Sequence, residues 1–102
     1  MACNYFFPAR AEQDFDETIN YIIADLHNPT AAQTLGRKIF EVIDNICEFP
    51  LSGALVVNSG IADNTVRRLI IDNYLLYYKF VEPDKLYILR IVYGQRKQPD
   101  IS

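Results

Sequence analysis

The sequence predicts an α+β fold in which an antiparallel pair of helices packs on one face of an antiparallel β-sheet. Apolar residues recur at helical spacing in two stretches before residue 50, and their period changes to two after about residue 65. Proline, glycine and short polar turns separate these regions. With a short aromatic strand at the start, the expected order is β-α-α-β-β-β in a single domain of residues 1–102.

The first strand and the first helix are expected between residues 5 and 27. Tyr5-Phe6-Phe7 is a short aromatic run typical of a strand, and Pro8 ends it. Apolar residues then follow at i, i+4, i+7, i+8 and i+11, which places them on one face of a helix. Acidic residues in the first turn suit the positive end of the helix dipole. The apolar positions are Phe15, Ile19, Ile22, Ile23 and Leu26, and the acidic ones are Glu12, Asp14 and Asp16.

A second helix is expected from Pro29 to about Glu48. Asn28 is a favoured N-cap, proline is favoured at the first helical position, and Pro50 ends the helix. Two amphipathic helices joined by so short a turn should form an antiparallel hairpin. The apolar face of this helix consists of Leu35, Ile39, Val42, Ile43, Ile46 and Phe49.

The rest of the chain is expected to form a loop and a three-stranded meander. Residues 51–64 are rich in glycine and polar residues, with a brief extended segment from Ala54 to Val57. Short turns at Asp72-Asn73 and at residues 82–85 then join three strands of alternating pattern. The predicted strands are residues 66–71, 74–81 and 86–93.

The middle strand of this meander is apolar on both faces. Tyr74, Leu76, Tyr78 and Phe80 share one face, whereas Leu75, Tyr77 and Lys79 share the other. One face must cover the helices. The other face is therefore expected to form an exposed apolar patch of the kind that marks a partner site.

Composition and charge exclude some classes of function. The chain is 50% hydrophobic, so the signature of intrinsic disorder is absent. A net charge of −3 and a pI near 5.0 argue against a general nucleic-acid binder. The charge is uneven, because residues 1–63 hold three basic and nine acidic residues while residues 64–102 hold seven and four. This asymmetry indicates a charged partner for the second part of the chain, or charge neutralisation within the fold.

Cys3 and Cys47 lack the spacing of a metal site or a redox motif. We expect both to be reduced thiols in a cytoplasmic protein, with Cys47 inside the second helix. The first residues lack the basic region of a signal peptide, and nothing approaches the ~20 apolar residues of a membrane span. Neither a metal nor a cofactor is expected.

The order of elements and several short segments together resemble the RelE/ParE toxins of bacterial type II toxin–antitoxin modules, which serve in plasmid stabilisation. Each segment alone is weakly specific, but their order and spacing extend over nearly the whole chain. The segments are Ala11 to Tyr21, Asn28-Pro29-Thr30-Ala31-Ala32, Phe49-Pro50-x-x-Gly53, Val66-Arg67-Arg68-Leu69, Asn73-Tyr74-x-x-x-Tyr78 and Ile88-Leu89-Arg90-Ile91-x-Tyr93-Gly94-x-Arg96.

The resemblance implies a microbial RNase-like fold and a cognate antitoxin that wraps the toxin. It also implies one of two activities. Some members of the family cleave mRNA at the ribosome, and members of the ParE type inhibit DNA gyrase without nuclease activity. Nuclease members resemble one another in an arginine early in the middle strand of the meander and, in some, a histidine late in the last strand. Here these positions hold Leu75 and Tyr93, and the only histidine, His27, is expected in the turn between the helices.

Several cationic and aromatic residues remain as candidates for a site. If the chain is a nuclease, its catalytic candidates are Arg67, Arg90, Tyr93 and Arg96, because RNA cleavage without a metal needs cations and a proton donor beside the phosphate. Structural roles compete with this interpretation. Arg67 and Arg68 could pair with Asp72 or with carboxylates of the first helix, Arg90 could form a buried ion pair, and Tyr93 could serve in packing. As a surface for an antitoxin or a target, the candidates are Arg67, Arg68, Tyr78, Arg90, Tyr93, Arg96 and Lys97.

The departures at Leu75 and Tyr93 favour a toxin that inhibits growth by binding a cellular target such as DNA gyrase. An acidic antitoxin segment would then use Arg67, Arg90 and Arg96 as anchors. Two alternatives stay open: a ribosome-dependent mRNA endonuclease, and a binding module without toxicity. A homodimer of the free chain is also compatible with the apolar sheet face.

Overall fold

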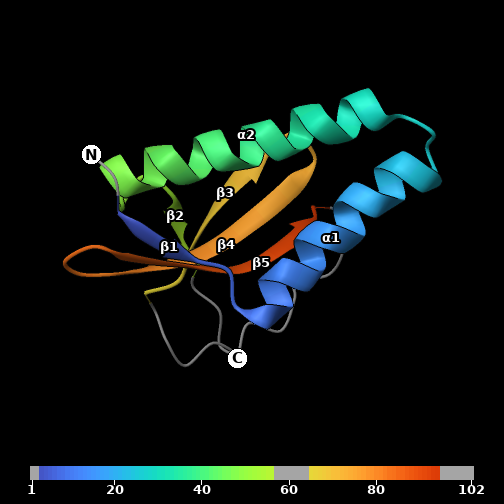
Figure 1. Ribbon diagram of the computed structural model, residues 1–102. Coiled ribbons are helices and arrows are strands. Elements are labelled where there is room, and N and C mark those ends of the chain that lie inside the picture. Colours follow the sequence, from blue (N-terminus) through green and yellow to red (C-terminus); the bar gives the residue numbers. More distant parts are fainter. Residues whose placement is uncertain (1–2, 57–64, 95–102) are drawn as a thin grey trace.

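The computed structural model describes residues 3–56 and 65–94, and two helices and five strands lie in these ranges. Both helices cover the same face of the sheet (Figure 1), so the predicted fold class is confirmed. The elements are β1 (Asn4–Phe6), α1 (Ala9–Ala24), α2 (Pro29–Glu48), β2 (Ala54–Leu55), β3 (Arg67–Ile71), β4 (Tyr74–Val81) and β5 (Lys85–Tyr93).

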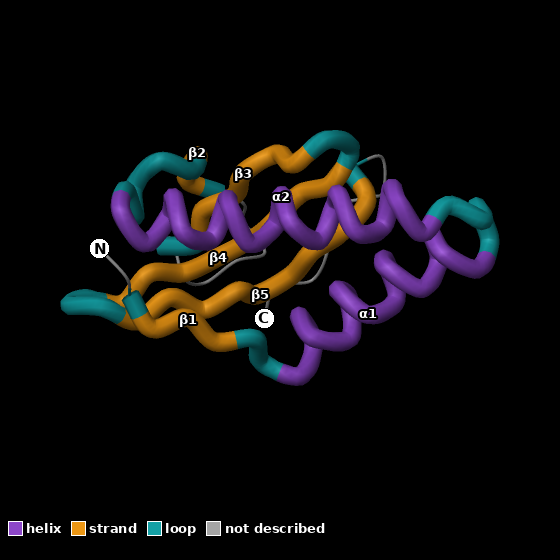
Figure 2. The backbone as a smooth tube through the Cα atoms, turned by 45° about the horizontal axis from the view of Figure 1, so that its top comes forward, coloured by secondary structure: helices purple, strands orange, loops and turns teal. Residues whose placement is uncertain are grey.

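The sheet has the strand order β1-β5-β4-β3-β2, which Figure 2 shows beneath the helices. The meander of β3, β4 and β5 is antiparallel, as predicted. Two details differ from the expectation. The first strand pairs in parallel with β5, and the brief extended segment after Gly53 is a fifth strand, β2, antiparallel to β3. Val57, at the end of the predicted extended segment, lies outside the described residues.

The second helix has the bounds that the sequence predicts. Asn28 caps it, because its side-chain oxygen accepts a hydrogen bond from the Ala31 N–H at 3.0 Å, and Pro29 occupies the first position. Phe49 leaves helical geometry directly before Pro50, whose ring disfavours a helical preceding residue. The local capping chemistry therefore suffices to set both ends of α2.

The first helix is shifted and buries less of its apolar face than predicted. It begins at Ala9, directly after Pro8, and ends at Ala24, before the predicted end at residue 27. Ile22 is 6% exposed, but Ile23 and Leu26 are 43% and 55% exposed. The reason is the position of the helix: the far ends of both helices extend beyond the sheet, as Figure 1 shows. Phe49 of the predicted α2 face is likewise exposed.

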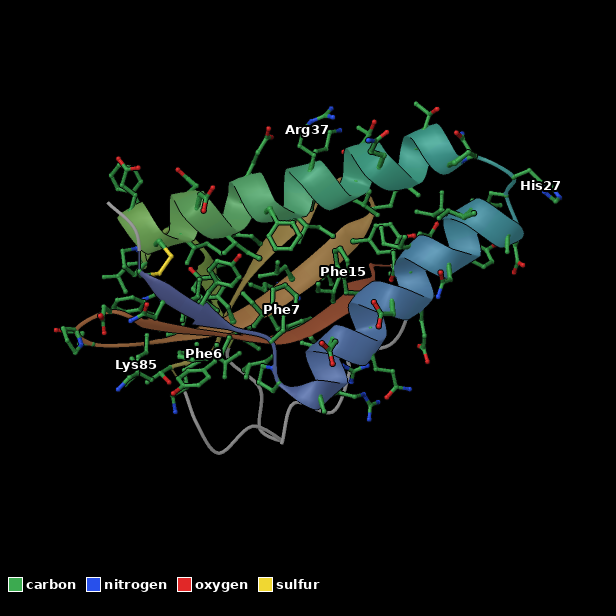
Figure 3. All side chains as sticks on the ribbon, viewed as in Figure 1. Phe6, Phe7, Phe15, His27, Arg37 and Lys85 are labelled. Carbon is green, nitrogen blue, oxygen red and sulfur yellow. A yellow bond between two sulfur atoms is a disulfide. The ribbon has the colours of Figure 1, made fainter. Side chains whose placement is uncertain are left out.

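The core lies between the helices and the sheet, and a smaller cluster lies on the opposite sheet face. In Figure 3, Phe7 and Phe15 point toward one another within the layer between helices and sheet, and their ring centroids are 6.1 Å apart. The alternation predicted for β4 is confirmed, since its even residues join the main core and Tyr77 joins the second cluster. The buried residues of the main core include Ile22, Leu35, Ile39, Ile43, Ile46, Leu76, Tyr78, Leu86, Ile88 and Ile91.

The second sheet face is not the exposed apolar patch that the sequence suggested. Tyr77 is fully buried and Val92 is 5% exposed, and both pack with Val56 and Val66. Ile70 is the exception, with 73% of its surface exposed. This face therefore contributes to the core rather than presenting a continuous apolar surface.

The expectation of two reduced thiols is wrong for this structure, because Cys3 and Cys47 form a disulfide bond. Cys47 does lie in α2, as predicted. The last turn of α2 lies beside the start of β1, where Figure 3 draws the yellow sulfur–sulfur bond. The two Cα atoms are 5.3 Å apart, a distance typical of disulfides, across a sequence separation of 44 residues. Sequence spacing alone does not reveal this contact, since it arises from the parallel pairing of β1 with β5.

We expect reduction of this bond to lower the stability of the fold. A cross-link across 44 residues constrains the unfolded chain by about 4 kcal/mol in the chain-entropy account. Urea denaturation with and without dithiothreitol should show a clearly lower midpoint after reduction. The variant in which Cys3→Ser and Cys47→Ser are combined is the control, and its midpoint should not respond to reductant. Equal midpoints for the wild-type chain in both conditions would contradict the prediction.

Candidate functional site

A cleft of about 690 Å³ opens between α1 and the adjoining ends of β4 and β5. One wall is a stripe of α1, in which residues three or four positions apart share a face. The other wall is the β3–β4 turn and the last residues of β5. The lining residues are Asp14, Glu17, Thr18, Tyr21, Leu26, Asn73, Tyr74, Ile91, Val92 and Tyr93.

An ion pair between α1 and β5 lies at the floor of this cleft. Arg90 Nε donates to Asp14 Oδ2 at 2.6 Å, and its Nη2 donates to Oδ1 at 3.2 Å. The backbone N–H of Ile91 also donates to Asp14 Oδ2, at 3.1 Å. Asp14 and Arg90 are only 7% and 8% exposed. The carboxylate thus accepts three hydrogen bonds, two of them from a guanidinium whose fork matches its geometry.

The backbone explains why these groups meet. In the described part of the chain, β1 pairs with β5 only as far as Tyr87, so the edge of β5 beyond it lies without a strand neighbour. The register of β4 and β5 shifts between Tyr77, opposite Arg90, and Tyr78, opposite Ile88. Arg90 has the same parity along β5 as Leu86 and Ile88, which pack in the core beneath the helices, and after the bulge Ile91 joins this core while Val92 joins the second cluster. Asp14 meets Arg90 from α1 and also accepts from the Ile91 N–H, an edge group that β1 leaves unpaired.

The rim of the cleft is aromatic and acidic. The rings of Tyr74 and Tyr93 meet edge to face with centroids 5.6 Å apart, and Tyr93 is 36% exposed. Tyr21 faces them from α1 and is 50% exposed. Glu17 is exposed and accepts a hydrogen bond from Gln13 at 2.9 Å. Because Arg90 balances Asp14, Glu17 leaves the lining with a net negative charge.

Two of the predicted binding residues, Arg67 and Tyr78, form hydrogen bonds to the turn between α2 and β2. The Tyr78 hydroxyl donates to the Pro50 carbonyl at 2.8 Å and accepts from the Gly53 N–H at 2.9 Å. Arg67 Nη1 donates to the Gly53 carbonyl at 2.8 Å. Tyr78 is fully buried, so it presents no surface to a partner. Both side chains hold the connection between α2 and β2 against the sheet.

Gly53 is required by this arrangement. A Cβ atom there would lie 2.7 Å from the Tyr78 hydroxyl oxygen and 2.9 Å from the carbonyl oxygen of Arg68. The backbone of residue 53 must therefore approach the sheet too closely for any side chain. The segment Phe49-Pro50-x-x-Gly53 singled out in the sequence thus has a structural explanation.

The remaining predicted residues are more scattered. Arg68 is exposed and lies opposite Tyr77 in the ladder, hence on the sheet face away from the helices. The structural alternative paired Arg67 and Arg68 with Asp72 or with carboxylates of the first helix, but among the described residues Asp72 pairs with Lys38, at 3.1 Å. The interpretation of Arg90 as a buried ion pair is confirmed. Arg96 and Lys97 lie outside the described residues.

Leu75 occupies the position at which nuclease members of the family carry an arginine, and His27 lies in the turn between the helices. Neither residue lines the cleft. Leu75 packs in the second apolar cluster. His27 lies at the tip of the helical hairpin and points away from the sheet in Figure 3.

Among the described residues, no cluster of histidine, cysteine or carboxylate side chains could hold a metal ion. None of the helices in the described ranges is long and apolar enough to cross a membrane.

The sequence reasoning missed the α1 side of the cleft. It treated Asp14 as a dipole partner at the helix start and did not single out Glu17 or Tyr21. A signal was present, because positions 14, 17, 18 and 21 form a polar and aromatic stripe at helical spacing. What the sequence could not provide was the element opposite this stripe, which depends on how β5 packs against α1.

Replacement of the buried carboxylate should destabilise the fold strongly. Asp14→Asn removes the carboxylate from the buried ion pair with Arg90, and breaking such a pair typically costs about 3–5 kcal/mol. Asp16→Asn is the matched control on the same helix, because Asp16 is exposed and should change the free energy of unfolding by less than about 0.5 kcal/mol. Urea denaturation of both variants tests this. Similar unfolding free energies for the two variants would refute the role given to Asp14.

Two tyrosine variants distinguish the hydrogen bonds of the Tyr78 hydroxyl from the packing of its ring. Tyr78→Phe should lower the unfolding free energy by about 1–3 kcal/mol, because it leaves the Gly53 N–H and the Pro50 carbonyl without their partner. Tyr77→Phe is the control, since the buried Tyr77 hydroxyl has no hydrogen-bond partner among the described residues. Its removal should be neutral or stabilising. A loss in Tyr77→Phe equal to that in Tyr78→Phe would overturn this assignment.

Comparisons with known proteins agree on the family. Residues 5–98 match the family described as the ParE toxin of type II toxin–antitoxin system, parDE. A chain of the chromosomal ParDE toxin–antitoxin system from P. aeruginosa has the same fold, with a TM-score of 0.68 and 19% identity over 91% of this chain and 97% of that chain. A search of curated proteins found no match. Because the family match extends over almost the entire chain, this protein belongs to the ParE toxin family of type II toxin–antitoxin systems.

Proposed function

We propose that this ParE-family toxin inhibits growth by binding a cellular protein, with DNA gyrase as the first candidate, and that it does not cut RNA. Membership of the family implies a cognate antitoxin of the ParD type. The observation that carries the proposal is the engagement of Arg90: its guanidinium is 8% exposed and bound to Asp14 inside the protein.

The chemistry of RNA cleavage explains why this engagement matters. Stabilising a transition-state phosphate requires cationic donors that are free to face the phosphate oxygens. Arg90 donates instead to a carboxylate of the protein, and Arg67 donates to a backbone carbonyl of the turn at Gly53. An arginine at residue 75 would add a cation, but this chain holds a leucine there. Of the other candidates, Tyr93 packs edge to face against Tyr74, and Arg96 lies outside the described residues.

The proposed contact residues are those with accessible side chains on the sheet. Arg68 is exposed on the face away from the helices, and Tyr93 is partly exposed at the end of β5. Arg96 and Lys97 continue the chain beyond Tyr93 and stay in the proposal as candidates. Arg67, Arg90 and Tyr78 are left out of this surface, because their polar groups bond inside the protein. We place the activity in the cytoplasm, where gyrase acts.

Induction of the gene alone in a bacterial host, followed within minutes by mapping of mRNA 5′ ends, tests the proposal. We expect growth arrest with intact transcripts. New 5′ ends inside translated codons would instead establish an mRNA endonuclease. Normal growth with confirmed soluble expression would favour a binding module without toxicity. Purified chain added to a DNA gyrase supercoiling assay then tests the proposed target.

An arginine pair tests the contact surface. Arg68→Ala should weaken growth arrest and any gyrase inhibition by about 3–10-fold, as expected for loss of a contact worth about 1 kcal/mol. Arg37→Ala is the control, since Arg37 is equally exposed but lies on α2 and points away from the sheet in Figure 3. Equal potency of the two variants would remove Arg68 from the proposed surface.

A further inference from the structure

The cleft beside α1 holds apolar surface that the other described residues leave uncovered. Ile91 and Val92 line it and are nearly buried, whereas Tyr21 on α1 and Leu26, two residues beyond its end, are 50% and 55% exposed. The apolar stripe of the helix thus continues beyond the point where the sheet covers it. At about 690 Å³, the cleft has the size of sites that enclose several side chains of a ligand.

The charge of the cleft is opposite to that expected for binding an acidic segment. Asp14 is balanced by Arg90, but Glu17 stands at the rim with its carboxylate exposed. Helix α1 as a whole carries four carboxylates and a single arginine, Arg10. An acidic segment placed here would meet like charge, and like charges in contact are a strong determinant against binding.

The aromatic groups at the rim favour a cation as well. Tyr21, Tyr74 and Tyr93 line one cleft from two sides, and the latter two pack edge to face. The face of a tyrosine ring attracts a Lys or Arg side chain within about 6 Å of its centroid. Glu17 supplies a formal negative charge beside these rings. Carboxylate and ring faces together are the chemistry that recognises a cationic side chain whose aliphatic stem also needs apolar contact.

We propose that this cleft receives a basic segment of the antitoxin, with an arginine or lysine beside Glu17 and the tyrosine faces, and a neighbouring aliphatic side chain on Leu26 and Tyr21. The inference rests on the proposed function in that it assumes a neutralising antitoxin. It reverses the expectation from the sequence, in which an acidic segment would pair with Arg67, Arg90 and Arg96. The guanidinium groups of Arg67 and Arg90 have partners inside the protein, and Arg96 lies outside the described residues.

A peptide titration tests the chemistry of the cleft without the antitoxin. The probe is acetyl-Leu-Arg-Leu-amide, added to isotope-labelled chain and followed by NMR, with acetyl-Leu-Glu-Leu-amide as the counter-probe. The arginine peptide should shift the amide signals of Thr18, Tyr21, Asn73 and Tyr93, and it should bind at least threefold more tightly than the glutamate peptide. Equal binding of both peptides, or shifts elsewhere on the molecule, would overturn the proposal.

A glutamate pair on α1 isolates the role of the rim carboxylate. Glu17→Gln should weaken the arginine peptide at least threefold and abolish most of its dependence on salt concentration. Glu12→Gln is the matched control, because Glu12 is also exposed on α1 but does not line the cleft. Equal affinities for these two variants would show that Glu17 takes no part.

Titration with the antitoxin tests whether the basic segment comes from the antitoxin. The antitoxin, expressed from the gene beside that of the toxin, should bind Glu17→Gln at least threefold more weakly than Glu12→Gln in calorimetric titrations. Unchanged affinity would overturn the assignment to the antitoxin. If the wild-type chain does not arrest growth, the proposed function is wrong but the cleft proposal is not affected. The peptide titration tests the cleft independently of toxicity.

Discussion

The interaction on which much of this structure depends is the contact of the Asp14 carboxylate with Arg90 and with the Ile91 N–H. It joins the first helix to the last strand and satisfies a backbone group at the strand edge where β1 has ended. Because both ionised groups are almost fully buried, each requires the other. Asp14 and Ile91 also line the cleft, so the contact that positions α1 lies beside the candidate binding site.

A second set of contacts fixes the other end of the helical layer. Tyr78 and Arg67 bind the turn after α2, and Gly53 lets the turn lie directly on the sheet. Nearby, the Cys3–Cys47 bond joins the end of α2 to the start of β1. These contacts are directional, whereas the apolar core between helices and sheet is tolerant of small displacements. Polar groups therefore set where each helix lies, and apolar burial provides the stability.

This use of polar groups bears on function within the ParE family. Arginine and tyrosine residues at a sheet look like a site for phosphate or for a partner when only the sequence is known. In this chain three of them, at positions 67, 78 and 90, bond within the protein. Among the described residues, the surface that remains beside α1 is acidic and aromatic instead. Proteins with the same fold can thus present different surface chemistry, because the fold does not determine which polar side chains form bonds inside the protein.

The sequence by itself determined the elements whose signals are local. Asn28 and Pro29 predict the start of α2, the alternation along residues 74–81 predicts both faces of β4, and Asp72 adopts the positive φ that the predicted turn tolerates. Only the tertiary structure decided the parallel pairing of β1, the disulfide and the partner of Arg90. Each of these joins residues more than 40 positions apart. Local propensities carry no information about such distant contacts, since the contacts form only when the whole chain packs.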